Sequence, residues 1–308
     1  MPRHYITFRD LSLEDYGLLF QRSFALKEER RKGVYLRNHL KGRPVAVLFS
    51  KNSTRTRVSF ECAVNELGGH AIILNLGDSQ WARGEPLSHS ARVFSGYVSA
   101  IVIRHGPEND LVKLSESASV PVVNALTDER HPCQVAADVF TILEKGRKIP
   151  LEKQKVCWIG DGGNMCQTWL EAAAVLGFAL NVSCPEGYQP DPSISKRAMA
   201  DNPEVRFLQD PLEAARGATV VTTDVFTSMG REKEAERRRK DFQGFQVNAK
   251  LMAAAAEDAI FLHCLPAHPG EEVTEEVFER HADSVFAEAE NRLHVQKALL
   301  ELLIPGLP

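Results

Sequence analysis

Short apolar runs recur along this chain at fairly regular intervals, and the segments between them carry helical patterns. Because the runs are brief, rich in β-branched residues and without polar alternation, they are typical of strands buried on both faces of a sheet. Alternation of such strands with helices predicts parallel α/β sheets. The predicted strands are Val45–Phe49, Ala71–Leu76, Ala100–Ile103, Val120–Ala125, Val156–Ile159, Ala179–Val182, Ala218–Val221, Ala259–Leu262 and Ser284–Ala287.

The length of 308 residues predicts two domains. A charged, turn-prone stretch at residues 144–150 interrupts the series of strands and is the best candidate for the boundary. We therefore expect two doubly wound parallel-sheet domains, residues 1–147 and 148–289, and a C-terminal helix at about residues 290–308 that packs back onto the first domain. Helices are also predicted at Arg57–Leu67 and Trp169–Leu176, each followed by glycine.

Composition limits the possible partners. The chain has 37 basic and 41 acidic residues, a formal net charge of −4, so nucleic acid is not an expected partner. Six cysteines show neither CxxC pairing nor zinc-type spacing, which indicates free thiols in a reducing compartment. The N-terminus lacks the pattern of a secretory or transit signal, and no apolar run approaches the length of a membrane span. We expect a cytoplasmic protein without a membrane partner.

Chemically reactive side chains follow almost every predicted strand. In the first half they are Ser50–Arg57, Gln80, Arg104 and His131–Gln134, and in the second half they are Asp161–Asn164, Asp224, His263–Pro266 and Glu288–Arg292. In open parallel sheets, ligands bind at the edge formed by the carboxyl ends of the strands. Two such edges that face each other would form one active-site cleft between the two domains.

The densest cluster is Ser53-Thr54-Arg55-Thr56-Arg57, shortly after the first strand. A helix that begins near Thr54 or Arg55 would direct its free N–H groups and positive dipole end toward the strand terminus. Hydroxyls and a guanidinium would then complete a site for an anion such as phosphate. The alternative is that Ser53 and Thr54 only cap the helix and the arginines are solvated. Capping explains one hydroxyl but not the whole set, so the anion site is favoured.

Three further residues allow two interpretations each. Arg104 ends a buried strand and is either a functional cation or part of a surface ion pair. His131, in the tetrapeptide His-Pro-Cys-Gln, is either a donor to a reacting carbonyl oxygen or a satisfied turn histidine. Asp224 follows a strand and either holds an ammonium group or caps a helix.

Three other motifs have a plain structural interpretation. Gly160–Asn164 lacks the GxGxxG spacing of a dinucleotide site, so its glycines are expected to allow a tight turn. The charged residues 231–240 are expected to form a solvated face or loop. His263 and Cys264 invite assignment as a base and its nucleophile. Adjacent residues of an extended chain point to opposite sides, however, and this argues against such a pair.

Several motifs resemble those of the ornithine carbamoyltransferase family, in order and spacing, over essentially the whole chain. They are Ser53–Arg57, Arg83-Gly84-Glu85-Pro86, Arg104, His131–Gln134, Asp224 with Ser228-Met229-Gly230, and His263-Cys264-Leu265-Pro266. The first cluster is shared with aspartate carbamoyltransferases, whereas Ser-Met-Gly and His-Cys-Leu-Pro together point to the ornithine branch. The resemblance implies transfer of the carbamoyl group of carbamoyl phosphate to the side-chain amine of L-ornithine, which gives L-citrulline and phosphate in arginine metabolism.

The resemblance also implies a role for each motif residue. The phosphate would be held by Ser53, Thr54, Arg55, Thr56 and Arg104, and the carbamoyl group by His131 and Gln134. Cys264, Leu265 and Arg292 would lie at the reacting centre, with Cys264, Arg104 and His131 as the catalytic residues. The amino-acid end of ornithine would be held by Asn164, Asp224, Ser228 and Met229. Gln80 would reach into a neighbouring subunit's site, which implies a homo-oligomer, either a trimer or a multiple of trimers. The resemblance implies no metal and no organic cofactor.

Two details leave the substrate open. Lys51-Asn52 stands where a lysine-proline pair is more common, and Trp81 lies in a loop that influences substrate choice in relatives that use acylated ornithine. Asp224 favours free ornithine, because an N-acetylated substrate lacks the α-ammonium group and would leave a buried carboxylate unpaired. The alternatives are an N-acetyl- or N-succinyl-ornithine carbamoyltransferase and a non-catalytic ligand-binding homologue.

Overall fold

The computed structural model describes residues 2–51, 53–146, 149–227 and 232–305. Contacts between Cα atoms group the chain into two compact units: residues 1–136 with 292–308 form the first unit, and residues 137–291 form the second. Both boundaries fall within helices, namely α5 (Pro132–Lys145) and α12 (Ala282–Leu303). The boundary predicted at residues 147 and 148 lies outside the described residues.

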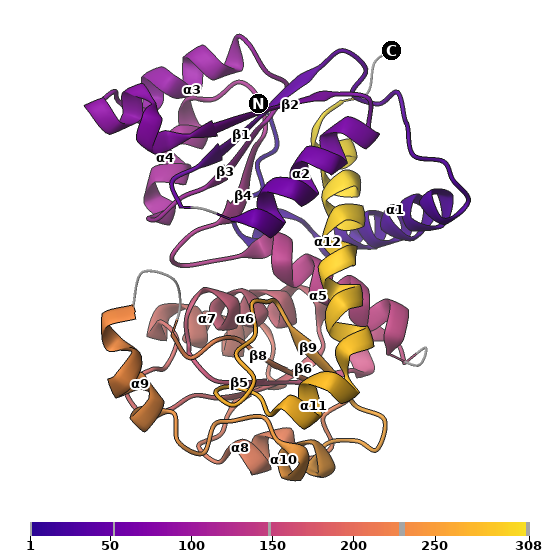
Figure 1. Ribbon diagram of the computed structural model, residues 1–308, viewed down its shortest axis with the longest axis vertical. Coiled ribbons are helices and arrows are strands. Elements are labelled where there is room, and N and C mark those ends of the chain that lie inside the picture. The colour runs from indigo at the N-terminus through magenta and orange to yellow at the C-terminus, as the bar shows by residue number, and fades with distance from the viewer. Residues whose placement is uncertain (1, 52, 147–148, 228–231, 306–308) are drawn as a thin grey trace. The chain divides into compact units, whose positions relative to one another are not determined.

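The first unit is built on a parallel sheet with the strand order β2-β1-β3-β4 (Figure 1). These strands are β2 (His70–Asn75), β1 (Pro44–Phe49), β3 (Ile101–Arg104) and β4 (Val122–Leu126). Helices α3 (Leu87–Ser95) and α4 (Glu108–Ser117) lie on one face and α2 (Thr54–Glu66) lies on the other. The unit also contains α1 (Leu13–Arg31) and the 3-10 turns η1 (Phe8–Asp10), η2 (Leu76–Asp78) and η3 (Gln80–Arg83).

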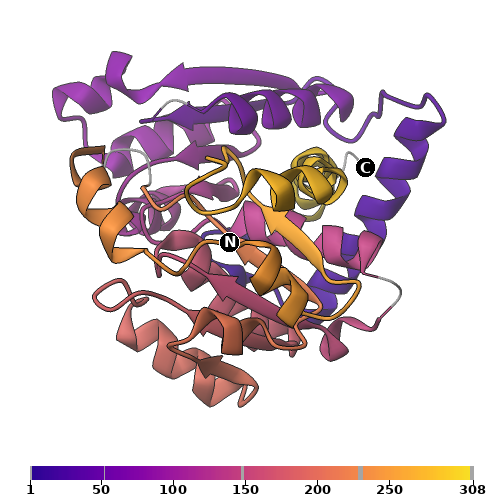
Figure 2. The same ribbon diagram turned by 60° about the horizontal axis from the view of Figure 1, so that its bottom comes forward.

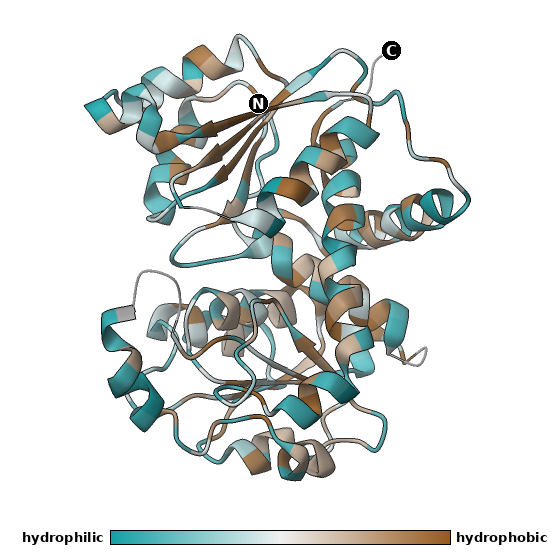
Figure 3. Cartoon of the chain, viewed as in Figure 1, coloured by the Kyte–Doolittle hydropathy of each residue, from teal (hydrophilic) through white to brown (hydrophobic). Residues whose placement is uncertain are grey.

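The central strands of this sheet are apolar along most of their length, as Figure 3 shows. Side chains of β1 alternate between the two faces, and Ala46 and Leu48 pack in one cluster with Ala91 of α3 and Leu111 of α4. Strand β2 differs, because its residues are half-buried or exposed and Leu74 is 37% exposed. The prediction of burial on both faces is therefore wrong for β2. The helices that cover the central strands leave this edge strand partly uncovered.

The end of α12 belongs to the first unit. Lys297 Nζ donates to Glu66 Oε2 at 2.6 Å, and Figures 1 and 2 show α12 and α2 side by side. Arg22 Nη2 of α1 donates to Glu301 Oε1 at 3.0 Å. Because Lys297 is only 1% exposed, loss of its partner Glu66 would leave a buried charge without compensation, so the pair fixes the position of the helix.

The second unit is built on a parallel sheet with the strand order β7-β6-β5-β8-β9. These strands are β7 (Val205–Phe207), β6 (Ala179–Ser183), β5 (Lys155–Ile159), β8 (Val220–Thr223) and β9 (Ile260–His263). Helices α6 (Asn164–Leu176) and α7 (Pro192–Asp201) lie on one face, and α8 (Pro211–Ala215), α10 (Ala249–Ala254) and α11 (Glu275–Arg280) pack on the other. The unit also contains α9 (Ala235–Asp241), η4 (Leu151–Lys153) and η5 (Glu232–Glu234). Two parallel sheets with helices on both faces confirm the predicted α/β class.

One strand predicted from the sequence is wrong, and one strand of the structure was not predicted. Ser284–Ala287 lies inside α12, where Val285 is fully buried and Phe286 is 57% exposed. A run this short cannot be told from one turn of a helix by its periodicity. Strand β7 was missed because only Val205 of its three residues is buried, so it lacks an apolar run.

Helix α12 begins at Ala282, earlier than the predicted start near residue 290. The sequence analysis placed Arg292 after a strand. In the structure Arg292 lies inside a helix. Although α12 has 22 residues, neither it nor any other helix of the described residues is long and apolar enough to cross a membrane.

Candidate functional site

In the first unit, the candidate site lies where the strand order reverses. Strands β1 and β3 are neighbours, although β2 comes between them in sequence, and Phe49 is in register with Arg104. Ser50 N donates to Arg104 O at 3.0 Å, which fixes the two strand ends together. Such a reversal leaves a crevice at the carboxyl edge of a doubly wound sheet, and ligands bind there. Arg104 is 9% exposed, so it is not a solvated surface arginine.

Helix α2 begins at Thr54, where the sequence predicted it. Ser53 is the N-cap residue, and its Oγ accepts from Thr56 N at 3.4 Å. Thr54 and Arg55 are exposed in the first turn, whereas Thr56 is fully buried. Capping therefore accounts for Ser53. Thr54 and Arg55 lie at the amino end of the helix, which attracts anions.

Arg292 joins two of the predicted site residues. Its Nη1 donates to Gln134 Oε1 and its Nη2 donates to Thr56 Oγ1, each at 2.8 Å. All three side chains are at least nine-tenths buried. One guanidinium thus holds the hydroxyl of α2 and the amide of α5 in fixed orientations.

His131 lies directly before α5 and is 4% exposed. Burial lowers the pKa of its imidazole well below the ordinary value, and the charges of Arg292, Arg104 and Arg55 lower it further. The ring is therefore neutral at pH 7. The three arginines are permanent cations, whereas His131 provides a neutral hydrogen-bonding ring in the same unit.

Gln80 is not part of this cluster within the unit. It is exposed at the start of η3, beyond the edge strand β2.

In the second unit, strand order reverses between β5 and β8. Thr223 Oγ1 at the end of β8 donates to Ile159 O at the end of β5 at 2.6 Å. The turn after β5 needs glycine, because a Cβ at Gly162 would lie 2.2 Å from Pro190 N. This close approach supports the interpretation of the glycines as turn residues. Asn164, half-buried, is the first residue of α6 at this edge.

Asp224 and Cys264 meet at the same edge. Cys264 Sγ donates to Asp224 Oδ1 at 3.2 Å, and Asp224 Oδ1 also accepts from Val225 N at 2.7 Å. Burial raises the pKa of the Cys264 thiol well above its ordinary value, and the charges of Asp224, Glu288 and Asp138 raise it further. The thiol is therefore protonated at neutral pH. Ser228 and Met229 lie outside the described residues.

His263 is held away from the Cys264 thiol. Its Nδ1 accepts from Leu265 N at 3.0 Å and its Nε2 lies 3.1 Å from Glu272 Oε1, so both ring nitrogens are engaged. His263 N donates to Glu288 Oε2 at 2.8 Å. This network shapes the turn that carries Cys264, in which Leu265 has a φ of 58° and packs against the apolar core of the unit.

Two family models together match nearly the whole chain. The model of the carbamoyl-phosphate-binding domain of aspartate/ornithine carbamoyltransferases matches residues 3–144, and the model of the Asp/Orn-binding domain matches residues 152–303. The chain belongs to the aspartate/ornithine carbamoyltransferase family.

Members of this family resemble the chain over nearly its full length. Ornithine carbamoyltransferase of Desulfotalea psychrophila is 48% identical over 302 residues, which covers 98% of this chain and 99% of that protein. The enzyme of the same name from Chromobacterium violaceum is 49% identical over 304 residues, which covers 99% of this chain and 97% of that protein.

Solved structures give the same result. Ornithine carbamoyltransferase from Pyrococcus furiosus has a TM-score of 0.93 and 42% identity, and the match covers 100% of this chain and 98% of that one. Anabolic ornithine carbamoyltransferase from Campylobacter jejuni has a TM-score of 0.91 and 42% identity, with 97% of each chain covered.

Three acidic residues support these carbamoyltransferase motifs, and of these only Glu288 was among the residues predicted at the strand ends. Glu272 and Glu288 position the His263–Leu265 turn, and Asp138 acts on the charge state of Cys264. No local signal marks Glu272 or Asp138, because neither directly follows a predicted strand.

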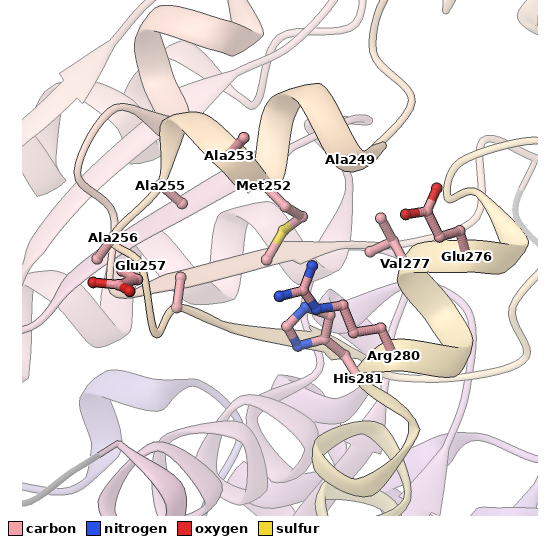
Figure 4. Close-up of a pocket in the computed structure, with 11 residues that line it drawn as sticks. Ala249, Met252, Ala253, Ala255, Ala256, Glu257, Glu276, Val277, Arg280 and His281 are labelled. Atoms are coloured by element: carbon pink, nitrogen blue, oxygen red, sulfur yellow. The ribbon is translucent and has the colours of Figure 1, made fainter.

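The second unit also holds a cavity and a group of three possible metal ligands. A cavity of about 390 Å³ is lined by Met252, Val277, Arg280 and His281 (Figure 4). Its lining includes Ala259, immediately before β9, so it opens at the amino end of that strand and not at the edge that carries Cys264.

His268, Glu271 and Glu272 place ligand atoms within 4.8 Å of one another. Their carboxylates are already bonded, however, since Glu272 contacts His263 and Glu271 pairs with Arg239.

Proposed function

We propose that the chain is an ornithine carbamoyltransferase, which transfers the carbamoyl group of carbamoyl phosphate to the side-chain amine of L-ornithine and releases L-citrulline and phosphate. The observation that carries the proposal is the arrangement of three arginines in the first unit: Arg55 lies in the first turn of α2, Arg104 ends β3, and Arg292 bonds Thr56 and Gln134. Buried His131 lies three residues before Gln134 and provides a neutral ring. A phosphate joined to a carbonyl needs cations for one part and a neutral donor for the other, and this cluster supplies both.

Carbamoyl phosphate is assigned to the first unit. Ser53, Thr54 and Arg55 bind the phosphate at the amino end of α2, together with Arg104. His131 and Gln134 bind the carbamoyl group. Arg292 contributes by orienting Gln134 and Thr56, whose oxygen atoms both accept its hydrogen bonds.

Ornithine is assigned to the second unit, with Asn164, Asp224, Ser228 and Met229 at its amino-acid end. Asp224 is half-buried at the end of β8 and provides the negative charge that the α-ammonium group requires. In the described residues, no helix begins directly after Asp224, which supports this role over helix capping.

The reaction begins with loss of a proton from the side-chain amine, whose pKa in water is about 10.4 if it resembles lysine. The amine nitrogen attacks the carbamoyl carbon, a C–N bond forms and the carbonyl oxygen becomes anionic. Thr56, Arg104 and His131 stabilise this oxygen. The bond from carbon to the bridging oxygen then breaks, and phosphate departs with the electron pair toward Arg55. The attacking nitrogen gives its second proton to the departing phosphate, which leaves the neutral ureido group of citrulline.

Cys264 is proposed to orient the amine without attacking carbon. Its raised pKa keeps it a thiol at neutral pH, so it is neither a ready nucleophile nor a ready base. No covalent intermediate is expected.

The test compares carbamoyl transfer to free L-ornithine with transfer to N-acetyl- and N-succinyl-ornithine. We expect product from the free amino acid alone. Transfer only to an acylated substrate would refute the assignment, and binding of carbamoyl phosphate without any transfer would identify a non-catalytic homologue.

Variants of Arg55 and Asp224 test the carbamoyl phosphate assignment and the ornithine assignment separately. Arg55→Ala should abolish carbamoyl phosphate binding in calorimetry, whereas Arg57→Ala, an exposed neighbour in the same helix, should leave it unchanged.

Asp224→Asn should raise the KM for ornithine about tenfold or more by removing a charge-assisted contact.

We further propose that the protein serves arginine biosynthesis in the cytoplasm as a homotrimer or a multiple of trimers. The anabolic description of the Campylobacter jejuni relative supports the pathway. Six free cysteines suit a reducing compartment. The partly uncovered strand β2 and the exposed Gln80 beyond it suit a contact between subunits.

A further inference from the structure

Helix α9 carries a buried arginine in a stretch that the sequence predicted to be solvated. The helix is drawn largely hydrophilic in Figure 3. The side chains of Arg237 and Arg239 are 72% and 61% exposed, whereas that of Arg238 between them is 0% exposed. The prediction for residues 231–240 is therefore wrong at Arg238.

The guanidinium of Arg238 has both polar and aromatic partners. Its Nη2 forms an ion pair with Asp161, and its Nε donates to Phe226 O at 2.5 Å. Its central carbon lies 4.7 Å from the ring centroid of Tyr188 and 5.2 Å from that of Phe242. Ion pairing, hydrogen bonding and cation–π contact together offset the desolvation of a fully buried cation.

The two polar contacts lie beside residues assigned to the amino-acid substrate. Asp161 is in the turn after β5, three residues before Asn164, and Phe226 lies two residues after Asp224. Because β5 and β8 are neighbours in the sheet, their turns leave the same edge side by side. Arg238 thus connects the two turns from a third segment of the chain.

We propose that Arg238 is a positioning residue for the amino-acid substrate: by binding Asp161 and the carbonyl of Phe226 at once, it holds Asn164 and Asp224 at a fixed separation. This inference rests on the proposed function, since it takes both residues to bind ornithine. A guanidinium is suited to the task because its planar fork donates in two directions while its faces stack on aromatic rings. The point charge of a lysine cannot satisfy both acceptors in the same way.

The experiment measures steady-state kinetics of the full-length wild type, Arg238→Lys, Arg238→Met and the control Arg239→Met. We expect the KM for ornithine to rise about tenfold or more in Arg238→Met and less in Arg238→Lys, while the KM for carbamoyl phosphate changes less than about twofold. Arg239→Met should match the wild type, because it removes only an exposed arginine paired with Glu271.

A purely structural role would lower the amount of folded enzyme and reduce kcat without changing either KM, and that result would overturn the proposal. Equal increases in the KM for ornithine and the KM for carbamoyl phosphate would also overturn the proposal. If Arg238→Met fails to fold, the test uses Arg238→Lys and Asp161→Asn. Each of these variants must raise the KM for ornithine selectively, without a matching rise in the KM for carbamoyl phosphate. Wild-type protein inactive toward ornithine would overturn both the proposed function and this inference, whereas active wild type with unchanged ornithine KM in these variants would overturn the inference alone.

Discussion

At the scale of single residues, charge states are decided by surroundings. Burial and three arginines lower the pKa of His131 well below its ordinary value, so the ring remains neutral where a solvated histidine would begin to titrate. A neutral ring can donate to a carbonyl oxygen while the arginines, which do not titrate, hold the phosphate. Burial, and not residue type alone, therefore decides that His131 acts as a neutral donor and the arginines act as cations.

Acid should destabilise the protein through His131. The folded state keeps the ring neutral and the unfolded state binds a proton below pH about 6.5, so stability is lost as the pH falls through that value. Between pH 7.5 and 5.5 we expect the free energy of unfolding to drop by about 1.4 kcal/mol more in the wild type than in His131→Asn. Urea unfolding at the two pH values measures the difference. His4 and His281, whose pKa values are also lowered, are present in both proteins and cancel. Equal losses would contradict a buried neutral His131.

The Cys264 thiol should react slowly with alkylating agents. Its raised pKa leaves little thiolate at pH 8, so we expect iodoacetamide to modify it about tenfold or more slowly than the same residue in urea-unfolded protein. Asp224→Asn should accelerate the reaction severalfold, because it removes a carboxylate that raises the pKa of the thiol. Mass spectrometry of the peptide that carries Cys264 follows the rate. An unaltered rate in the variant would show that Asp224 does not control the thiol.

At the scale of elements, the turn after β5 shows how tightly the sheet edge is built. Gly162 N donates to Tyr188 O at 2.8 Å, and this approach brings the backbone of residues 188–190 against the glycine. A side chain at this position has no room. The turn therefore requires glycine for close packing and not for dinucleotide binding.

Gly162→Ala should destabilise the second unit by about 1–3 kcal/mol, since the new Cβ collides with backbone atoms that cannot rotate away. Gly163→Ala is the matched control, because its Cβ would meet nothing closer than Asp161 Oδ2 at 3.6 Å. Thermal unfolding of the two variants measures the contrast. Similar stability of the two variants would mean that the turn adjusts freely.

At the scale of the whole molecule, the first unit has an uncovered edge. Strand β2 is partly exposed, and Leu74 and Val58 present apolar side chains that are 37% and 52% exposed. Gln80 follows this strand and is also exposed. An uncovered sheet edge with apolar neighbours suits contact with a second copy of the chain, which would bring Gln80 to that copy's phosphate site.

The proposal that Gln80 completes the site of a neighbouring subunit predicts complementation between inactive variants. Gln80→Ala lacks the residue donated to a neighbour, whereas Arg55→Ala lacks its own phosphate ligand. When the two are unfolded and refolded together, mixed oligomers should contain sites with an intact Arg55 from one subunit and an intact Gln80 from the next. We expect activity to return only in the mixture, at a fraction of the wild-type level. No recovery, in mixtures that light scattering shows to be trimeric, would place Gln80 outside the site.

The sequence by itself determined most of the strands, the start of α2 and the residues that cluster at the sheet edges. These features depend on near neighbours in the chain: apolar runs such as Val45–Phe49 form strands, and Ser53 caps the helix that follows. The same local logic failed at Ser284–Ala287, because a short apolar run fits one turn of a helix equally well.

Only the tertiary structure decided which charged side chains are buried and what they hold. Arg292 was predicted at a strand end and instead reaches Thr56 and Gln134 from the middle of α12. Arg238 was predicted to be solvated and is fully buried. The physical reason is the same in both cases: a charge can be buried only where partners satisfy it, and these partners come from segments far away in sequence.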